Sequence, residues 1–145
     1  MAVCDSDGVR FEYPESWKLS REERGHDVTL HIETDGTAFW SLTMLTSRPT
    51  AQEAVDAVIA AFEEEYRDVD VYDGPELVVE GPTAICELDF VCLDLVVSAV
   101  VQAEMTTEFT ALVIYQGESR EFEDLRPQFA QIAASLQYAG DVPDA

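Results

Sequence analysis

The chain has 145 residues, 47% of them hydrophobic, which suits one domain with a core of its own rather than a disordered segment. Its 30 acidic residues outnumber 8 basic ones and give a formal net charge of −22. Binding to nucleic acid or to an anionic membrane needs clustered lysine and arginine, so this composition argues against both as partners.

The cause of the acidity is open at the level of sequence. A host that keeps its proteins acidic in high salt, compositional drift, and a surface for a basic partner would each produce it. The first two are favoured, because runs of charge usually form solvated faces.

The amino end and the cysteines predict a cytoplasmic protein. The first eight residues, MAVCDSDG, lack the basic and apolar regions of a signal peptide. The longest apolar run, residues 83–103, contains three acidic residues and is not expected to span a bilayer. Cys4 is placed in a mobile amino-terminal segment. Cys86 and Cys92 are an even number of residues apart and are expected to share the buried face of one strand.

The first predicted strand covers residues 9–13, where apolar and polar side chains alternate as in a half-buried strand. Pro14 has no N–H to donate to a neighbouring strand, so pairing stops there and Pro-Glu-Ser forms a tight corner. A second strand restarts at Trp17. The corner therefore has an aromatic residue on each rim, Tyr13 and Trp17.

Residues 27–47 predict a β-hairpin, because two alternating segments, DVTLHIET and AFWSLTMLTS, flank the turn signal DGT. The core-facing side chains are expected to be Val28, Leu30 and Ile32 in the first strand and Trp40, Leu42 and Met44 in the second. Phe39 and Leu45 lie on the opposite face of the second strand. They would form an exposed apolar strip there if no helix covered them.

Two helices are predicted. Thr50 and Glu53 form a capping box that opens the first, whose apolar stripe runs to Tyr66. The second is predicted to begin near Asp124, with Pro127 in its first turn, where the missing N–H costs no hydrogen bond. Its buried stripe is expected to consist of Leu125, Phe129, Ile132 and Leu136.

Between the helices the pattern predicts strands. DVDVYDGPE is a short strand and a turn, and residues 83–104 are one long apolar segment that we split near Leu93-Asp94 into two strands. EFTALVIYQ is a central strand, apolar on both faces. Connections of hairpin length make the sheet mainly antiparallel, and the fold class is therefore α+β. Residues 1–138 form a single domain, and residues 139–145 a flexible tail.

These features resemble the PsbP-like superfamily. The resemblance lies in the early strand that ends in Tyr-Pro-x-x-Trp (Tyr13, Pro14 and Trp17), the hairpin, the single helix, the antiparallel sheet and the pattern of the closing helix. That closing pattern is carried by Leu125, Pro127, Phe129, Ile132, Ser135 and Leu136. The superfamily includes an extrinsic photosystem II subunit, a nuclear-import factor that binds the Ran GTPase, DcrB-like bacterial proteins and chaperones of secreted effectors. It implies an α/β/α sandwich, with helices flanking the sheet, that binds other proteins and is not typically an enzyme.

No reactive constellation is evident from the residues. His26 and His31 are five apart on or near one strand, so they point to opposite faces and are not expected to share a metal. Glu87 and Asp89 share a face, but no calcium-binding loop accompanies them. No nucleophile motif or glycine-rich phosphate loop occurs. Catalytic residues, metal ligands and cofactors are therefore not predicted.

The function predicted from these observations is a non-enzymatic adaptor or chaperone-like module. It would bind a protein through a sheet face or through the proline corner, and a homodimer is a second option. The candidate interaction residues are Tyr13, Trp17, Phe39 and Leu45, although packing in the core is the simpler role for the two aromatic residues of the corner. The alternative is a small-molecule or lipid-binding domain with a pocket between the sheet and the residue 55–66 helix. A hydrolase is the least favoured.

Overall fold

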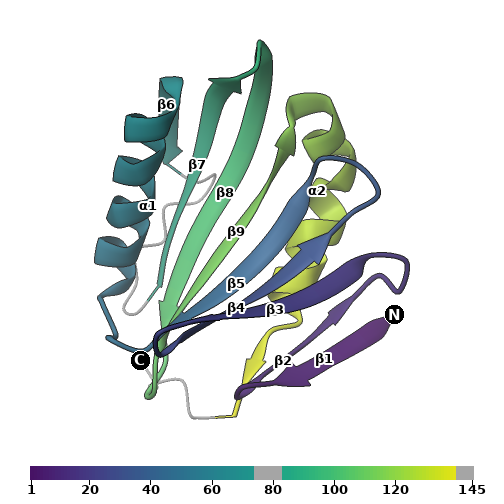
Figure 1. The fold of residues 1–145 in the computed structure, drawn as a ribbon, viewed down its shortest axis with the longest axis vertical. Coiled ribbons are helices and arrows are strands. Elements are labelled where there is room, and N and C mark those ends of the chain that lie inside the picture. Colours follow the sequence, from purple (N-terminus) through teal and green to yellow (C-terminus); the bar gives the residue numbers. More distant parts are fainter. Residues whose placement is uncertain (74–82, 140–145) are drawn as a thin grey trace.

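A computed structural model describes residues 1–73 and 83–139, in which two helices lie on either side of a large antiparallel sheet (Figure 1). The strands are β1 (Ala2–Ser6), β2 (Val9–Tyr13), β3 (Lys18–Arg24), β4 (Asp27–Glu33), β5 (Phe39–Leu45), β6 (Arg67–Asp73), β7 (Thr83–Cys92), β8 (Leu95–Met105), β9 (Thr110–Glu118) and β10 (Gln137–Tyr138). The helices are α1 (Ala51–Glu65) and α2 (Ser119–Ala134). This arrangement confirms the predicted α+β class.

The large sheet has seven strands in the order β3-β4-β5-β9-β8-β7-β6, and neighbouring strands pair antiparallel. The predicted split of the long apolar segment is confirmed, because Cys92 pairs with Leu95 and a two-residue turn joins β7 to β8. The strand β9 lies between β5 and β8, as its apolar character on both faces predicted.

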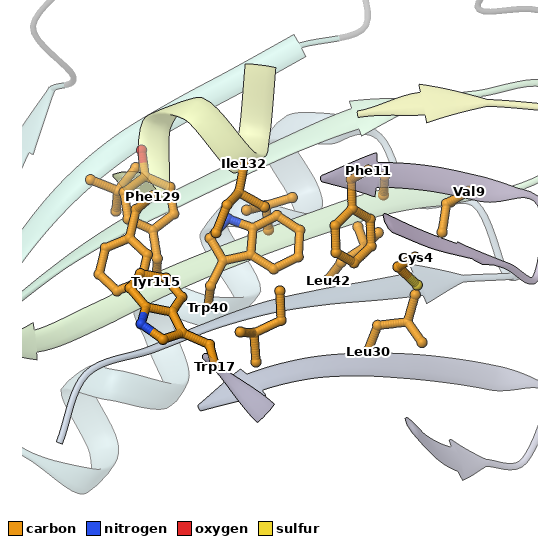
Figure 2. Packing of buried hydrophobic residues seen from close by; sticks show 14 of the residues in the cluster. Cys4, Val9, Phe11, Trp17, Leu30, Trp40, Leu42, Tyr115, Phe129 and Ile132 are labelled. Carbon is orange, nitrogen blue, oxygen red and sulfur yellow. The ribbon is translucent and has the colours of Figure 1, made fainter. Parts of the chain in front are cut away.

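One face of the large sheet packs against α2 and a small sheet of order β1-β2-β10. Aromatic side chains fill this interface, and Figure 2 shows the indole of Trp40 between Phe11 and the α2 side chains. The ring centroids of Trp40 and Phe11 are 5.0 Å apart, and both side chains are fully buried. The predicted inward positions of β4 and β5 therefore face the core of the domain.

The other face of the large sheet is covered by α1 over strands β6 to β9. The predicted cap of α1 is confirmed, since the Thr50 hydroxyl accepts a hydrogen bond from the backbone N–H of Glu53 at 3.1 Å. Val55 is buried against the sheet, and Phe62 packs on Phe90 of β7 with ring centroids 5.2 Å apart. The two helices thus enclose the sheet as an α/β/α sandwich.

The predicted start of α2 is wrong. The helix begins at Ser119. The carboxylate of Glu118 caps it by accepting hydrogen bonds from the backbone N–H groups of Arg120 and Glu121. Pro127 lies inside the helix on its exposed side, where water can bond the carbonyl that loses its helical partner. The earlier start places Phe122 in the core, fully buried.

The amino-terminal segment is also corrected. Residues around Cys4 form β1, which pairs with β2, and the Cys4 side chain is buried in the core. The two residues of β10 pair with the other edge of β2, at Val9 and Arg10, and so close the small sheet. The predicted loose tail lies outside the described residues except for Ala139, whose N–H donates to the Gly8 carbonyl at 2.9 Å.

Candidate functional site

The proline corner forms as predicted, but its tryptophan belongs to the core. The backbone N–H of Trp17 donates a hydrogen bond to the Pro14 carbonyl at 3.1 Å and closes the corner as a turn. The indole of Trp17 packs on Phe129 of α2, with ring centroids 5.6 Å apart, and only 9% of the residue is exposed (Figure 2). Tyr13 is half-buried beside Phe11. Most of the aromatic surface at the corner is therefore used to hold α2 on the sheet.

A small hollow of about 260 Å³ remains beside Trp17, lined also by Leu125 and by the start of α2. Of the predicted interaction residues, Trp17 alone lines it.

Phe39 and Leu45 do not form one continuous strip. Phe39 is half-buried, and its ring stacks on His31 of the neighbouring strand at 4.9 Å between centroids. Leu45, at the other end of β5, packs against the cluster that lies under α1. The helix thus covers one end of β5, and a histidine ring covers part of the other.

The interface between α1 and the sheet, where a ligand pocket was an alternative, is filled by side chains. Val58, Ile59 and Phe62 of the helix pack on the same buried cluster as Phe90 of β7. A larger hollow opens instead at the end of this interface, where α1 ends and β6 begins. Its volume is about 570 Å³, and it is lined by residues 65–68 and 91–94.

Exposed apolar side chains gather at the adjoining turn between β7 and β8. Leu93 is 91% exposed, Leu95 53% and Val96 49%. We call these three residues and the hollow beside them the hairpin-tip surface. Figure 1 shows the β7–β8 turn and the carboxyl end of α1 at the same upper end of the molecule.

The turn itself is strained. Leu93 and Asp94 have φ values of 50° and 65°, in the left-handed region that two-residue hairpin turns require and that glycine and asparagine fill best. A branched apolar residue in this region costs roughly 1–2 kcal/mol. Leu93 makes no compensating core contact, because almost all of it is exposed. The predicted split near Leu93-Asp94, which places an apolar residue at the junction of two strands, is the sequence signal for this site.

The aromatic residue that lines the hollow, Tyr66, is held by an aromatic stack beneath it. Tyr66 lies against Phe90 with ring centroids 4.3 Å apart, and Phe62 packs on its edge at 5.8 Å. Burial, followed by the carboxylate of Glu65 and the thiol of Cys92, raises the pKa of the Tyr66 phenol. The hairpin-tip surface thus joins an apolar floor to a negative surrounding.

A second cluster, under α2, is polar. Arg126 forms an ion pair with Glu87 and lies over the Phe122 ring at 5.5 Å. Ser98 donates to Asp89 at 2.8 Å and lies 3.0 Å from the Ser119 hydroxyl. The cavity beside these groups measures about 120 Å³. Arg126 neutralises Glu87 and Ser98 bonds Asp89, and the cluster serves to hold α2 on β7 and β8.

The histidines and acidic residues are not arranged as a metal centre. Within residues 1–73 and 83–139, no group of three or more histidine, cysteine, aspartate or glutamate side chains could hold a metal ion. His26 lies in the turn between β3 and β4, whereas His31 lies within β4, 4.0 Å from the Glu33 carboxylate.

Comparison with known proteins gives a fold. The sequence matches no protein-family model and no curated protein sequence. The structure is similar to the solution structure of cyanobacterial PsbP (CyanoP) from Synechocystis sp. PCC 6803, with a TM-score of 0.56 and 12% sequence identity. The match covers 90% of this chain and 86% of that chain. The chain has a PsbP-like fold.

The PsbP-like fold confirms what the proline corner and the closing helix implied about architecture. At 12% identity the likeness extends to the fold and carries no residue role from CyanoP to this chain. The more distant relatives that the sequence suggested, DcrB-like proteins among them, stay predictions. Neither of the two described helices has the length and apolar character needed to cross a membrane.

Proposed function

We propose that this chain is a non-catalytic accessory module that binds another protein through the hairpin-tip surface. The observation that carries the proposal is Leu93, which is strained in its backbone and 91% exposed at the rim of a hollow of about 570 Å³. Strained residues that the surrounding fold does not need are concentrated at binding sites. The PsbP-like fold supports a binding role because accessory proteins share it.

The apolar area at the tip is enough for an anchor and too small for a whole interface. Burying a leucine or valine side chain fully contributes roughly 1.5–3 kcal/mol. Association itself costs an estimated 4–15 kcal/mol in lost freedom of motion. Leu93, Leu95 and Val96 together offset only part of that cost, so the partner must also contact the hollow beside them.

The surface differs from the interaction residues that the sequence predicted. Trp17 and Leu45 are used in packing, and Tyr13 and Phe39 are half-buried on separate parts of the molecule. A large aromatic residue is easy to notice in a sequence, but packing in the core buries it and removes it from the surface. The tip offers accessible apolar atoms, which a docking surface needs.

The test uses the substitution Leu93→Asn, which removes the apolar side chain and supplies a residue suited to the left-handed turn. The matched control is Val3→Thr on β1. Val3 is an apolar residue that is 48% exposed, and it lies far from the tip in the sequence and in the other sheet. Each form is immobilised and incubated with native lysate. A protein that wild type and Val3→Thr retain, but that Leu93→Asn does not, is then purified.

The affinity of that protein for the three forms is then measured by calorimetry. We expect Leu93→Asn to weaken binding by about tenfold or more, the equivalent of losing one buried leucine, and Val3→Thr to leave it unchanged. If all three forms retain the same proteins with the same affinity, the hairpin-tip surface is not the docking site.

A further inference from the structure

The carboxylates around the hollow lie beside an exposed apolar residue, Leu93. Glu65, Asp68 and Asp94 line the hollow, together with one basic residue, Arg67. Within the described chain, none of these four side chains forms an ion pair or a hydrogen bond. Elsewhere in the described chain some carboxylates are paired, as Asp7 is with Arg21 at 2.8 Å and Glu87 with Arg126, whereas others such as Glu12 and Glu108 are not.

The end of α1 adds to this negative field. The carboxyl end of a helix carries the equivalent of about half a negative charge, which basic residues in the last turn usually offset. The last turn of α1 has no basic residue and contains Glu63, Glu64 and Glu65 instead. This arrangement costs the isolated protein some helix stability, and a bound cation would recover it.

The apolar floor and the negative rim are adjacent, so a single ligand can use both. Tyr66 and Cys92 belong to the same hollow as Glu65 and Asp94, and Leu93 projects from its edge. A free metal ion or a polyamine would leave Leu93 exposed, and an anionic lipid or nucleic acid would be repelled.

We propose that the segment recognised at this surface is a positively charged stretch of a partner protein, with lysine or arginine next to large apolar side chains. This rests on the proposed function and adds the chemistry of the partner. The apolar side chains pack on Leu93 and Tyr66, and the cations lie against Glu65, Asp68 and Asp94. The net charge of −22 speeds the encounter through long-range attraction, and the local carboxylates select the site.

The probe is a fluorescent peptide of alternating lysine and leucine, titrated into the full chain and followed by anisotropy. Two further peptides, one alternating glutamate with leucine and one alternating lysine with serine, test the two requirements separately. We expect the lysine–leucine peptide to bind, with an affinity that falls as salt is raised, and both other peptides to bind at least about tenfold more weakly.

Local recognition is separated from overall charge by two triple variants with the same net charge. The first neutralises the rim through Glu65→Gln, Asp68→Asn and Asp94→Asn. The second neutralises exposed carboxylates elsewhere through Glu12→Gln, Glu108→Gln and Asp124→Asn. Surface ion pairs contribute roughly 0.2–1 kcal/mol each, so the rim variant is expected to lose about tenfold in affinity for the lysine–leucine peptide and the control variant little.

Equal loss in both triple variants, or equal binding of the glutamate–leucine peptide, overturns the proposed partner chemistry. The docking surface itself would survive that result, provided that Leu93→Asn still weakened binding of the natural partner. If Leu93→Asn does not weaken binding of the natural partner, the proposed function is overturned instead. The two failures are therefore distinguishable. Circular dichroism of each variant establishes that the fold is retained.

Discussion

Two hairpin turns of the large sheet, β4–β5 and β7–β8, solve the same geometric problem in opposite ways. The β4–β5 connection is polar and tied to the domain. Its Thr34 hydroxyl donates to the Ala38 carbonyl at 2.8 Å, and the Glu121 carboxylate of α2 accepts from the Thr37 hydroxyl at 2.8 Å and from the Ala38 N–H at 3.1 Å. A Cβ at Gly36 would collide with the Glu121 carboxylate, which would have to move away from its hydrogen bonds.

The β7–β8 turn has none of these restraints. Its two residues are Leu93 and Asp94, both with positive φ, and in the described chain neither side chain makes a hydrogen bond. A turn sequence such as Asn-Gly would fit this backbone with less strain. The comparison teaches that the fold can fasten a hairpin end to α2 where order is needed. It has left a strained apolar residue at the β7–β8 turn, where we place the docking surface.

The largest expected effect comes from untying the β4–β5 connection with Glu121→Ala. Hydrogen bonds to a charged group contribute roughly 1.5–3 kcal/mol in favourable cases, and we expect a loss of about 2 kcal/mol in the free energy of unfolding. Chemical denaturation measures it, with Glu123→Ala on the same helix as the matched control, since the ion pair of Glu123 with Arg126 is exposed and long at 3.4 Å. Similar stabilities for the two variants would remove the contrast between the turns.

The same carboxylate makes stability depend on pH. Burial by itself would raise the pKa of Glu121, but the hydrogen bonds from Thr37 and Ala38 outweigh it and lower that pKa. Because the pKa is lower in the folded state, this contribution is present above the ordinary glutamate pKa of 4.5 and is lost as the pH falls below it. In Glu121→Ala the corresponding part of the acid destabilisation should disappear.

A smaller effect of opposite sign is expected at the β7–β8 turn. Leu93→Asn relieves the left-handed strain and should raise the free energy of unfolding by about 1 kcal/mol. Thermal unfolding measures this without any partner present. Leu95→Thr, a change at an exposed strand position of the same hairpin with no positive φ, serves as the control. A destabilised Leu93→Asn would mean that the leucine contributes to the fold, and its exposure would lose its functional meaning.

Much of the fold was predictable because its signals are local and periodic. Alternation placed Trp40, Leu42 and Met44 in the core, and Thr50 and Glu53 placed the start of α1. The start of α2 was misplaced, since the general preference of proline for the first turn outweighed the weaker signal of Glu118 as a cap. Local signals therefore fix an element more reliably than they fix its ends.

Two features depended on contacts between distant segments and were missed. The strand β1 is short and is ordered by pairing with β2, whose other edge is completed by β10 from the far end of the chain. The candidate site was missed because Leu93 lies in an apolar run whose pattern predicts burial, while the turn that exposes it is set by the pairing of Cys92 with Leu95. The predicted split near Leu93-Asp94 located the turn, but which side chains the turn exposes follows from the register of the pairing.

The smallest expected effect concerns a third turn, between β1 and β2, which resembles the tied hairpin. Asp7 and Gly8 have φ values of 56° and 84°, a turn sequence suited to this conformation, and Asp7 accepts two hydrogen bonds of 2.8 Å from Arg21 of β3. Those bonds, together with one from Ser6, lower the pKa of Asp7 from 3.8 to about 2. The resulting stability is complete above pH 3.8 and is lost as the pH falls toward 2.

Arg21→Gln should flatten this part of the acid unfolding curve, whereas Arg24→Gln, whose pairing with Glu22 is highly exposed, should leave it unchanged. Identical acid curves for the two variants would show that the Asp7–Arg21 pair does not fasten the turn, and the contrast would then rest on the β4–β5 connection alone.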